Sequence, residues 1–111
     1  MDKKYKAKII DKSIYIEFYG DIDDSICPCY KEQIGELIKI NKNKDLIFDF
    51  KNVTFIDSSG IGFILGRYNQ LKTYKKKLYV TNTSEHIQKL FRISGIYTII
   101  TEYNKTKQEV K

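Results

Sequence analysis

The sequence of 111 residues contains only one proline, one histidine and two cysteines. So little proline argues for regular secondary structure, and the 41% hydrophobic and 31% charged residues are typical of a folded domain. No apolar run approaches the roughly 20 residues that a membrane-spanning helix needs. The N-terminal segment lacks the apolar stretch of a secretion signal, so we expect a cytoplasmic protein that has no membrane partner.

The scarcity of cysteine and histidine restricts metal and redox chemistry. Cys27 and Cys29 flank Pro28, and a disulfide between cysteines two residues apart would be badly strained. His86 is remote in sequence, and no second cysteine pair is present to complete a tetrahedral metal site. We therefore predict free thiols at the start of a helix, no metal site and no cofactor.

The net charge of +6 raises the question of nucleic-acid binding. The lysines are scattered, however, before the first expected strand and in the connections at 42–44 and 75–77. The sequence has no arginine cluster, zinc-finger spacing or aromatic RNA-binding motif. Because basic loops between amphipathic elements are usually solvated surface, we expect no direct nucleic-acid partner.

Hydrophobic spacing predicts an alternating order of strands and helices. The connection at 11–12 suggests a hairpin, and GDID at 20–23 interrupts the strand pattern before the first helix. The expected strands are 5–10, 13–19, 45–50, 78–81 and 97–101, and the expected helices are 28–41, 58–71 and one that begins at Ser84. After a brief connection that follows Phe50, the segment 53–57 leads the chain to the serines.

This order predicts an α/β fold in a single domain spanning residues 1–111. Strands joined through a helix should be parallel, so the sheet should be mixed and mostly parallel, covered by about four helices. The polar tail at 104–111 is expected to be a short helix or a frayed end.

The stretch FIDSSGIGFILGRY at 55–68 places an acid and two hydroxyls between a strand pattern and the clearest amphipathic helix. A nucleophilic serine needs a base and an orienting group, and the G-x-S-x-G spacing of a nucleophile elbow is absent. The glycines are spaced G-x-G-x-x-x-G with no Walker lysine, which is weak support for nucleotide binding. Helix capping requires only one of Asp57, Ser58 and Ser59, so at least one serine hydroxyl has no role as a cap.

Two glycines inside this helix, Gly62 and Gly66, lie off its apolar stripe, which consists of Ile61, Ile64, Leu65, Tyr68 and Leu71. Each helix-interior glycine costs about 1 kcal/mol relative to alanine. We therefore expect them to form a smooth surface that another backbone or a partner can approach closely.

Phosphorylation is the remaining use for the second hydroxyl. It would add about −1.5 to −2 charges at pH 7, which a helix N-terminus tolerates. A partner surface that fits a neutral hydroxyl would be opposed by this charge beside Asp57. Binding could then be switched off without refolding.

The run from Asp45 to Lys72, together with GDID and the segment HIQKLFRISGIYTII, resembles bacterial anti-sigma factor antagonists of the STAS-domain family. The likeness is greatest to the sporulation type, which acts on the sigma F pathway. It covers nearly the whole chain, although Cys27-Pro28-Cys29 has no counterpart in the family pattern and Asp21 stands where the family usually has glutamate.

The resemblance implies a regulator and not an enzyme. The unphosphorylated antagonist would bind an anti-sigma factor that is also a GHKL-type serine kinase, and so release the sigma factor. The kinase would then phosphorylate the first serine of D-S-S-G, which is Ser58. A serine phosphatase would later remove the phosphate and restore the active antagonist. The implied partner-binding residues are Asp21, Asp23, Asp57, Ser58, Ser59, Gly60 and Gly62.

Three alternatives remain open from the sequence. The chain could be a STAS phosphoswitch of a general stress pathway, a STAS domain that binds a small molecule or nucleotide, or an enzyme, in that order of preference.

Overall fold

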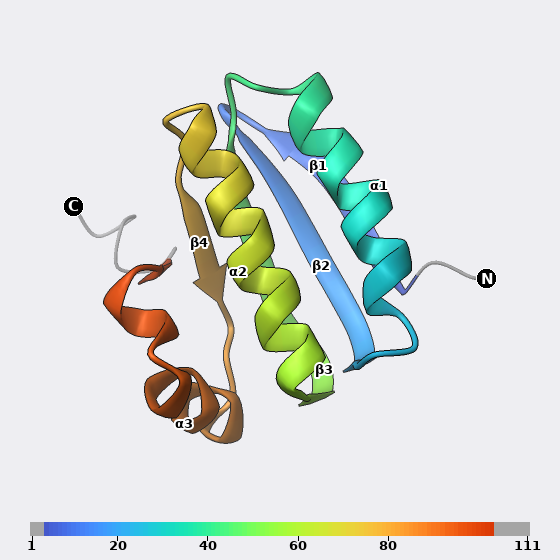
Figure 1. The fold of residues 1–111 in the computed structure, drawn as a ribbon, viewed down its shortest axis with the longest axis vertical. Helices are drawn as coiled ribbons and strands as arrows, with labels where there is room; N and C mark the ends of the chain where they lie inside the picture. Colours follow the sequence, from blue (N-terminus) through green and yellow to red (C-terminus); the bar gives the residue numbers. More distant parts are fainter. Residues whose placement is uncertain (1–3, 104–111) are drawn as a thin grey trace.

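The computed structural model describes residues 4–103, which form one sheet, two long helices packed on it and a shorter third helix (Figure 1). The strand order is β1-β2-β3-β4-β5. β1 and β2 pair antiparallel and the other neighbours pair parallel, which confirms the predicted mixed, mostly parallel sheet. The strands are β1 (Tyr5–Ile10), β2 (Ser13–Ile22), β3 (Asp45–Ile56), β4 (Leu78–Thr81) and β5 (Thr101–Glu102).

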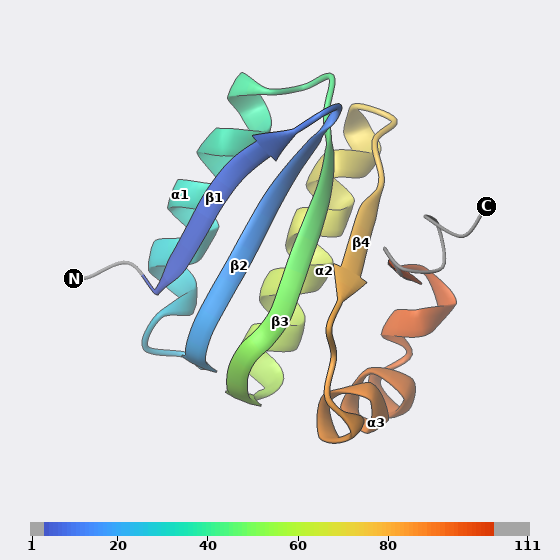
Figure 2. The ribbon, with the colours of Figure 1, turned by 180° about the vertical axis from the view of Figure 1, so that it is seen from behind.

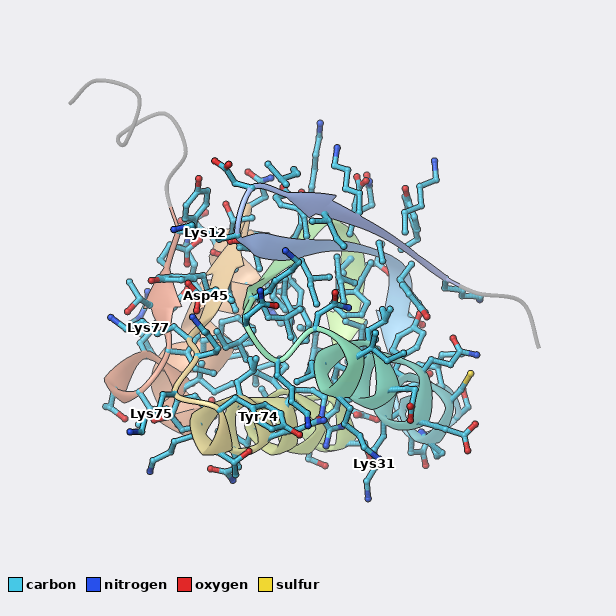
Figure 3. All side chains as sticks on the ribbon, turned by 90° about the horizontal axis from the view of Figure 1, so that it is seen from above. Lys12, Lys31, Asp45, Tyr74, Lys75 and Lys77 are labelled. Atoms are coloured by element: carbon cyan, nitrogen blue, oxygen red, sulfur yellow. The ribbon has the colours of Figure 1, made fainter. Side chains whose placement is uncertain are left out.

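Both long helices cover the same face of the sheet. α1 (Cys27–Ile40) and α2 (Ser58–Thr73) lie side by side, while Figure 2 shows the strands in front when the molecule is seen from behind. Successive crossovers of one hand between adjacent parallel strands place their helices on one face. Seen from above, the helices therefore form one layer and the sheet a second (Figure 3).

Aromatic rings fill the space between the layers. Phe18 of β2 lies 5.0 Å from Phe48 of β3, and Phe48 stacks on Phe63 of α2 with ring centroids 5.7 Å apart. Pairs of this kind contribute about 0.5–1.5 kcal/mol beyond their burial. This core anchors α2, and therefore the turn at its N-terminus, to the two central strands.

α1 begins and ends where the sequence predicts. Pro28 lies in its first turn, Asn41 is its C-cap, and Cys27 and Cys29 are free thiols at its start. A proline is tolerated there because the first helical N–H groups have no intrahelical acceptor. The face of this helix that is fully buried consists of Tyr30, Ile34 and Ile38.

The two central strands are longer than predicted. The interruption expected at GDID is wrong, since β2 continues to Ile22, and the expected break in β3 before Val53 is also wrong. The pairing of β2 with β3 is irregular near GDID, with register shifts after Glu17 and after Gly20. Gly20 itself has a φ of +73°. Glycine adopts this conformation without steric cost.

The end of the described chain differs most from the prediction. The structure has three α-helices among residues 4–103, with α3 spanning Glu85–Ser94 after its N-cap Ser84, so about four was too many. The final strand is present but lies later than the expected 97–101, as β5 at Thr101–Glu102, because Gly95 has a φ of +83° and turns the chain into the 3₁₀ helix η1 (Ile96–Thr98). The expectation for the tail at 104–111 falls outside the described residues.

The buried face of α2 is rotated from the predicted stripe. Phe63 and Arg67 are buried, whereas Ile61, Leu65 and Tyr68 are only partly buried. The reason is that α2 packs against α1 as well as against the sheet. Gln70 of α2, for example, donates a 2.8 Å hydrogen bond to the carbonyl of Gly35.

Candidate functional site

The candidate site lies where β2 and β3 end side by side. Ile22 pairs with Ile56, and the backbone N–H of Asp57 donates to the Ile22 carbonyl at 3.3 Å. The turn that leads into α1 and the turn that leads into α2 are thus held at the same edge of the sheet. The structure brings Asp21 and Asp23 next to the turn that carries Ser58.

Asp57 is the N-cap of α2. Its carboxylate accepts a hydrogen bond from the Gly60 N–H at 3.1 Å, and its carbonyl accepts one from the Ile61 N–H. This arrangement satisfies helix donors and places a negative charge at the positive end of the helix dipole. Neither of the two serine hydroxyls that follow is needed as the cap.

Ser58 is the first residue of α2 and is exposed, whereas Ser59 is half-buried. Within residues 4–103, the Ser58 hydroxyl has no hydrogen-bond partner. An exposed hydroxyl at the start of a helix can be reached by another protein. A phosphate there would meet backbone N–H groups that have no intrahelical acceptor.

Gly60 fixes how closely this turn approaches the sheet. A Cβ at this position would lie 2.6 Å from Ile56 Cγ2 and 2.8 Å from the Ile22 carbonyl oxygen. Only glycine fits such an approach without movement of the backbone. Gly62, by contrast, is exposed, and a Cβ added there would meet no atom within 4 Å, in agreement with a smooth helix surface.

The acidic residues at the end of β2 and in the turn after it accept hydrogen bonds from neighbouring side chains. The carboxylate of Asp23 accepts from the Ser25 hydroxyl at 2.6 Å and from the Ser25 N–H at 3.1 Å. Asp21 accepts from the Thr54 hydroxyl at 2.7 Å. The sequence does not reveal Ser25 and Thr54 as their partners, although Asp-x-Ser is a common spacing for an Asx turn.

The hydrogen bond from the Ser25 hydroxyl lowers the pKa of Asp23 below its usual value, with help from backbone donors and Lys4. Ser25→Ala should therefore raise this pKa toward that of an unperturbed aspartate, as measured by carboxyl NMR titration. Because the folded-state pKa is the lower one, the bond stabilises the fold above the ordinary aspartate pKa, and this contribution is lost as the pH falls through the folded value. Ser94→Ala should leave the titration unchanged, and an unchanged Asp23 in Ser25→Ala would contradict the assignment.

Cys27 is a poor nucleophile and metal ligand at neutral pH. Burial, together with Asp57, Asp23 and Asp24, raises the pKa of its thiol to about 11. The thiolate is the reactive and metal-binding form. Across the described part of the chain, no group of three or more histidine, cysteine or acidic side chains could hold a metal ion.

Arg67 is a functional candidate that the hydrophobic periodicity of the sequence does not reveal. It is 8% exposed, its guanidinium carbon lies 5.6 Å from the centre of the Phe63 ring, and its Nε has no hydrogen-bond partner. Arginine is ordinarily exposed, so its place in the sequence gives no indication of burial. Its burial follows from the tertiary structure, because α1 covers this side of α2.

The fold and this site define a small α/β domain that presents an exposed serine, at the start of a capped helix, beside an acidic turn. The family model described as "STAS domain" matches residues 4–111, and the chain belongs to this family. None of the helices within residues 4–103 is long and apolar enough to cross a membrane.

Two relatives and one solved structure illustrate the similarity. The chain is 26% identical to an anti-sigma F factor antagonist of Paenibacillus polymyxa, over 82% of this chain and 78% of that protein. It is also 26% identical to an anti-sigma-B factor antagonist of Staphylococcus aureus, over 89% and 91% of the two chains. The Bacillus cell fate determinant SpoIIAA in its phosphorylated form shares the fold, with a TM-score of 0.73, 22% identity and coverage of 96% and 99%.

Proposed function

We propose that this chain is an anti-sigma factor antagonist, and that phosphorylation of Ser58 switches it off. The relatives named as antagonists of anti-sigma factors support the class. The observation that carries the mechanism is the exposed Ser58 hydroxyl, which follows the Asp57 cap and has no partner within the described residues. The whole chain would act as one cytoplasmic STAS domain.

In the unphosphorylated state, the site would bind an anti-sigma factor that is also a serine kinase and so release the sigma factor. We assign the contact to the exposed edge formed by the two turns. Its members are Asp21, Asp23, Asp57, Ser58, Ser59, Gly60 and Gly62. The acids would face basic groups of the partner, and the exposed Gly62 would allow its backbone to come close. Gly60 would contribute by holding the turn against the sheet.

The kinase would transfer the γ-phosphoryl group of ATP to the Ser58 oxygen. A P–O bond to serine forms as the bond between the β-bridging oxygen and the γ-phosphorus breaks, a base of the kinase takes the hydroxyl proton, and ADP leaves. A serine phosphatase would later hydrolyse the ester. In this scheme the chain is a substrate and regulator of an enzyme, with no catalytic residues, cofactor or nucleic-acid contact of its own.

The pathway is proposed to be that of sigma F, as in sporulation. The likeness to the Paenibacillus polymyxa antagonist of anti-sigma F supports this choice. A general stress pathway is the second candidate, because the Staphylococcus aureus relative is named an antagonist of anti-sigma-B.

The test is to incubate the chain with the serine kinase that co-purifies with it and with ATP, and then to map phosphopeptides. We expect a single phosphate on Ser58, none in Ser58→Ala, and unchanged incorporation in the control Ser94→Ala, which removes an exposed serine of α3 outside the proposed contact. Modification mainly at Ser59, Ser84 or Ser94 would overturn the proposal.

A further inference from the structure

A hollow of about 600 Å³ lies between the N-terminal halves of α1 and α2, the two helices that run side by side in Figure 1. Ser59 lies at its edge, so the hollow adjoins the candidate site. Two small residues of α2, Gly62 and Gly66, contribute to its wall, and a Cβ added at either would meet nothing within 4 Å. Lys31 of α1 and Arg67 of α2 supply two positive charges to the lining.

Arg67 is the unusual member of this lining. It is 8% exposed, and its Nε is buried without a hydrogen-bond acceptor. Within residues 4–103, its only specific interaction is the contact of its guanidinium with the Phe63 ring at 5.6 Å. A buried donor without an acceptor is costly, so the unpaired Nε of this guanidinium, which has no carboxylate beside it, points to a missing acceptor.

The other charges at the hollow favour the same kind of ligand. Lys31 is exposed and projects from the helix layer on the side away from the sheet (Figure 3). The acidic group in the lining is Asp24, which precedes α1 and therefore lies toward the end near Ser59. An incoming carboxylate would be repelled at that end and attracted toward Lys31 and Arg67.

We propose that this hollow receives an acidic side chain, aspartate or glutamate, of the protein that binds at Ser58. The inference rests on the proposed function and extends its interface along the groove between α1 and α2. A guanidinium pairs with a carboxylate through parallel N–H donors, and the two glycines leave room for the partner's backbone to deliver it. The open shape of the hollow and its position beside Ser59 fit a side chain of that partner.

The test compares Arg67→Met with the matched control Lys72→Met, which removes an exposed cation from the last turn of the same helix. Methionine keeps an unbranched stem that can pack on Phe63. Calorimetric titration with the co-purifying serine kinase should show about ten- to hundredfold weaker binding for Arg67→Met, and little change for Lys72→Met. Urea unfolding should show at most a small loss of stability in Arg67→Met, because the charge that it removes has no carboxylate partner and loses only its contact with the Phe63 ring.

A second measurement, a chemical crosslink, uses the wild-type chain. A carbodiimide should couple the Lys31 amine to an acidic side chain of the bound kinase, forming an amide as the reagent takes up water. Replacing that acid with its amide should weaken binding to the wild-type chain, and should have little further effect on Arg67→Met.

The outcomes separate the two proposals. If the wild-type chain binds the kinase and Arg67→Met binds equally well, or if Lys31 forms no such crosslink, the acidic-side-chain site is wrong and the proposed function stands. If Arg67→Met unfolds more easily while its binding is unchanged, Arg67 is structural and the site is again wrong. If the wild-type chain binds no anti-sigma kinase, both proposals fail.

Discussion

Gly60→Ala should lower the free energy of unfolding by about 2–3 kcal/mol. The added methyl group would stand 2.6 Å from Ile56 Cγ2, 2.8 Å from the Ile22 carbonyl oxygen and 3.2 Å from Ile22 Cγ2. One of these neighbours is backbone, so relief requires α2 to move away from the ends of both central strands. The melting temperature should fall by roughly 10 °C in thermal unfolding followed by circular dichroism.

Gly62→Ala is the matched control for this substitution. It lies in the same helix, two residues further on, and its added methyl group meets nothing within 4 Å. Alanine has the higher helix propensity, so this variant should be more stable by about 0.5–1 kcal/mol. Equal stability of the two variants would show that the turn is not packed as closely against β2 and β3 as the structure has it.

Ser58→Asp should lose binding to the anti-sigma kinase by more than about a hundredfold, whereas Ser58→Ala should bind and release the sigma factor constitutively. A surface that fits a neutral hydroxyl would have to bury a poorly paired charge, and such desolvation costs several kcal/mol per ion. About 3 kcal/mol is enough for the expected loss. Calorimetric titration of each variant measures the effect.

The same two variants should fold equally well. Ser58 is exposed and begins a helix whose dipole and free N–H groups favour an anion, so the aspartate is not buried within the domain. Their melting temperatures should differ by no more than a few degrees. A large fall in Ser58→Asp would mean that a lost fold, and not the charge at the interface, explains the lost binding.

Much of the fold could be predicted from helix caps and apolar alternation, because these features depend only on residues that are close in the sequence. Pro28 and Asn41 mark the two ends of α1, Ser84 caps α3, and the apolar alternation of β2 follows from a sheet with one face on the core. The final strand, expected at 97–101, begins only at Thr101 for a related reason. Gly95 sets a left-handed turn, and the burial of Ile96 and Ile100 four residues apart suits a helical turn as well as a strand.

The candidate site was predictable in its centre but not in its surroundings. Asp57, Ser58 and Gly60 are consecutive or nearly so, and their residue types alone indicate a capped helix start. The bond between Thr54 and Asp21 joins residues 33 positions apart and depends on the pairing of β2 with β3. The burial of Arg67 likewise depends on α1, so no periodicity within α2 reveals it.

The central claim is that phosphorylation of Ser58 blocks binding through charge at the interface while the domain keeps its fold. The most direct measurement is to compare the amide NMR spectra of the unphosphorylated and phosphorylated chains, and to titrate each calorimetrically with the anti-sigma kinase. We predict shifts confined to residues 57–62 and the turn around Asp23, together with a loss of binding of more than about a hundredfold. Shifts spread across the whole sheet, or binding that survives phosphorylation, would contradict the account.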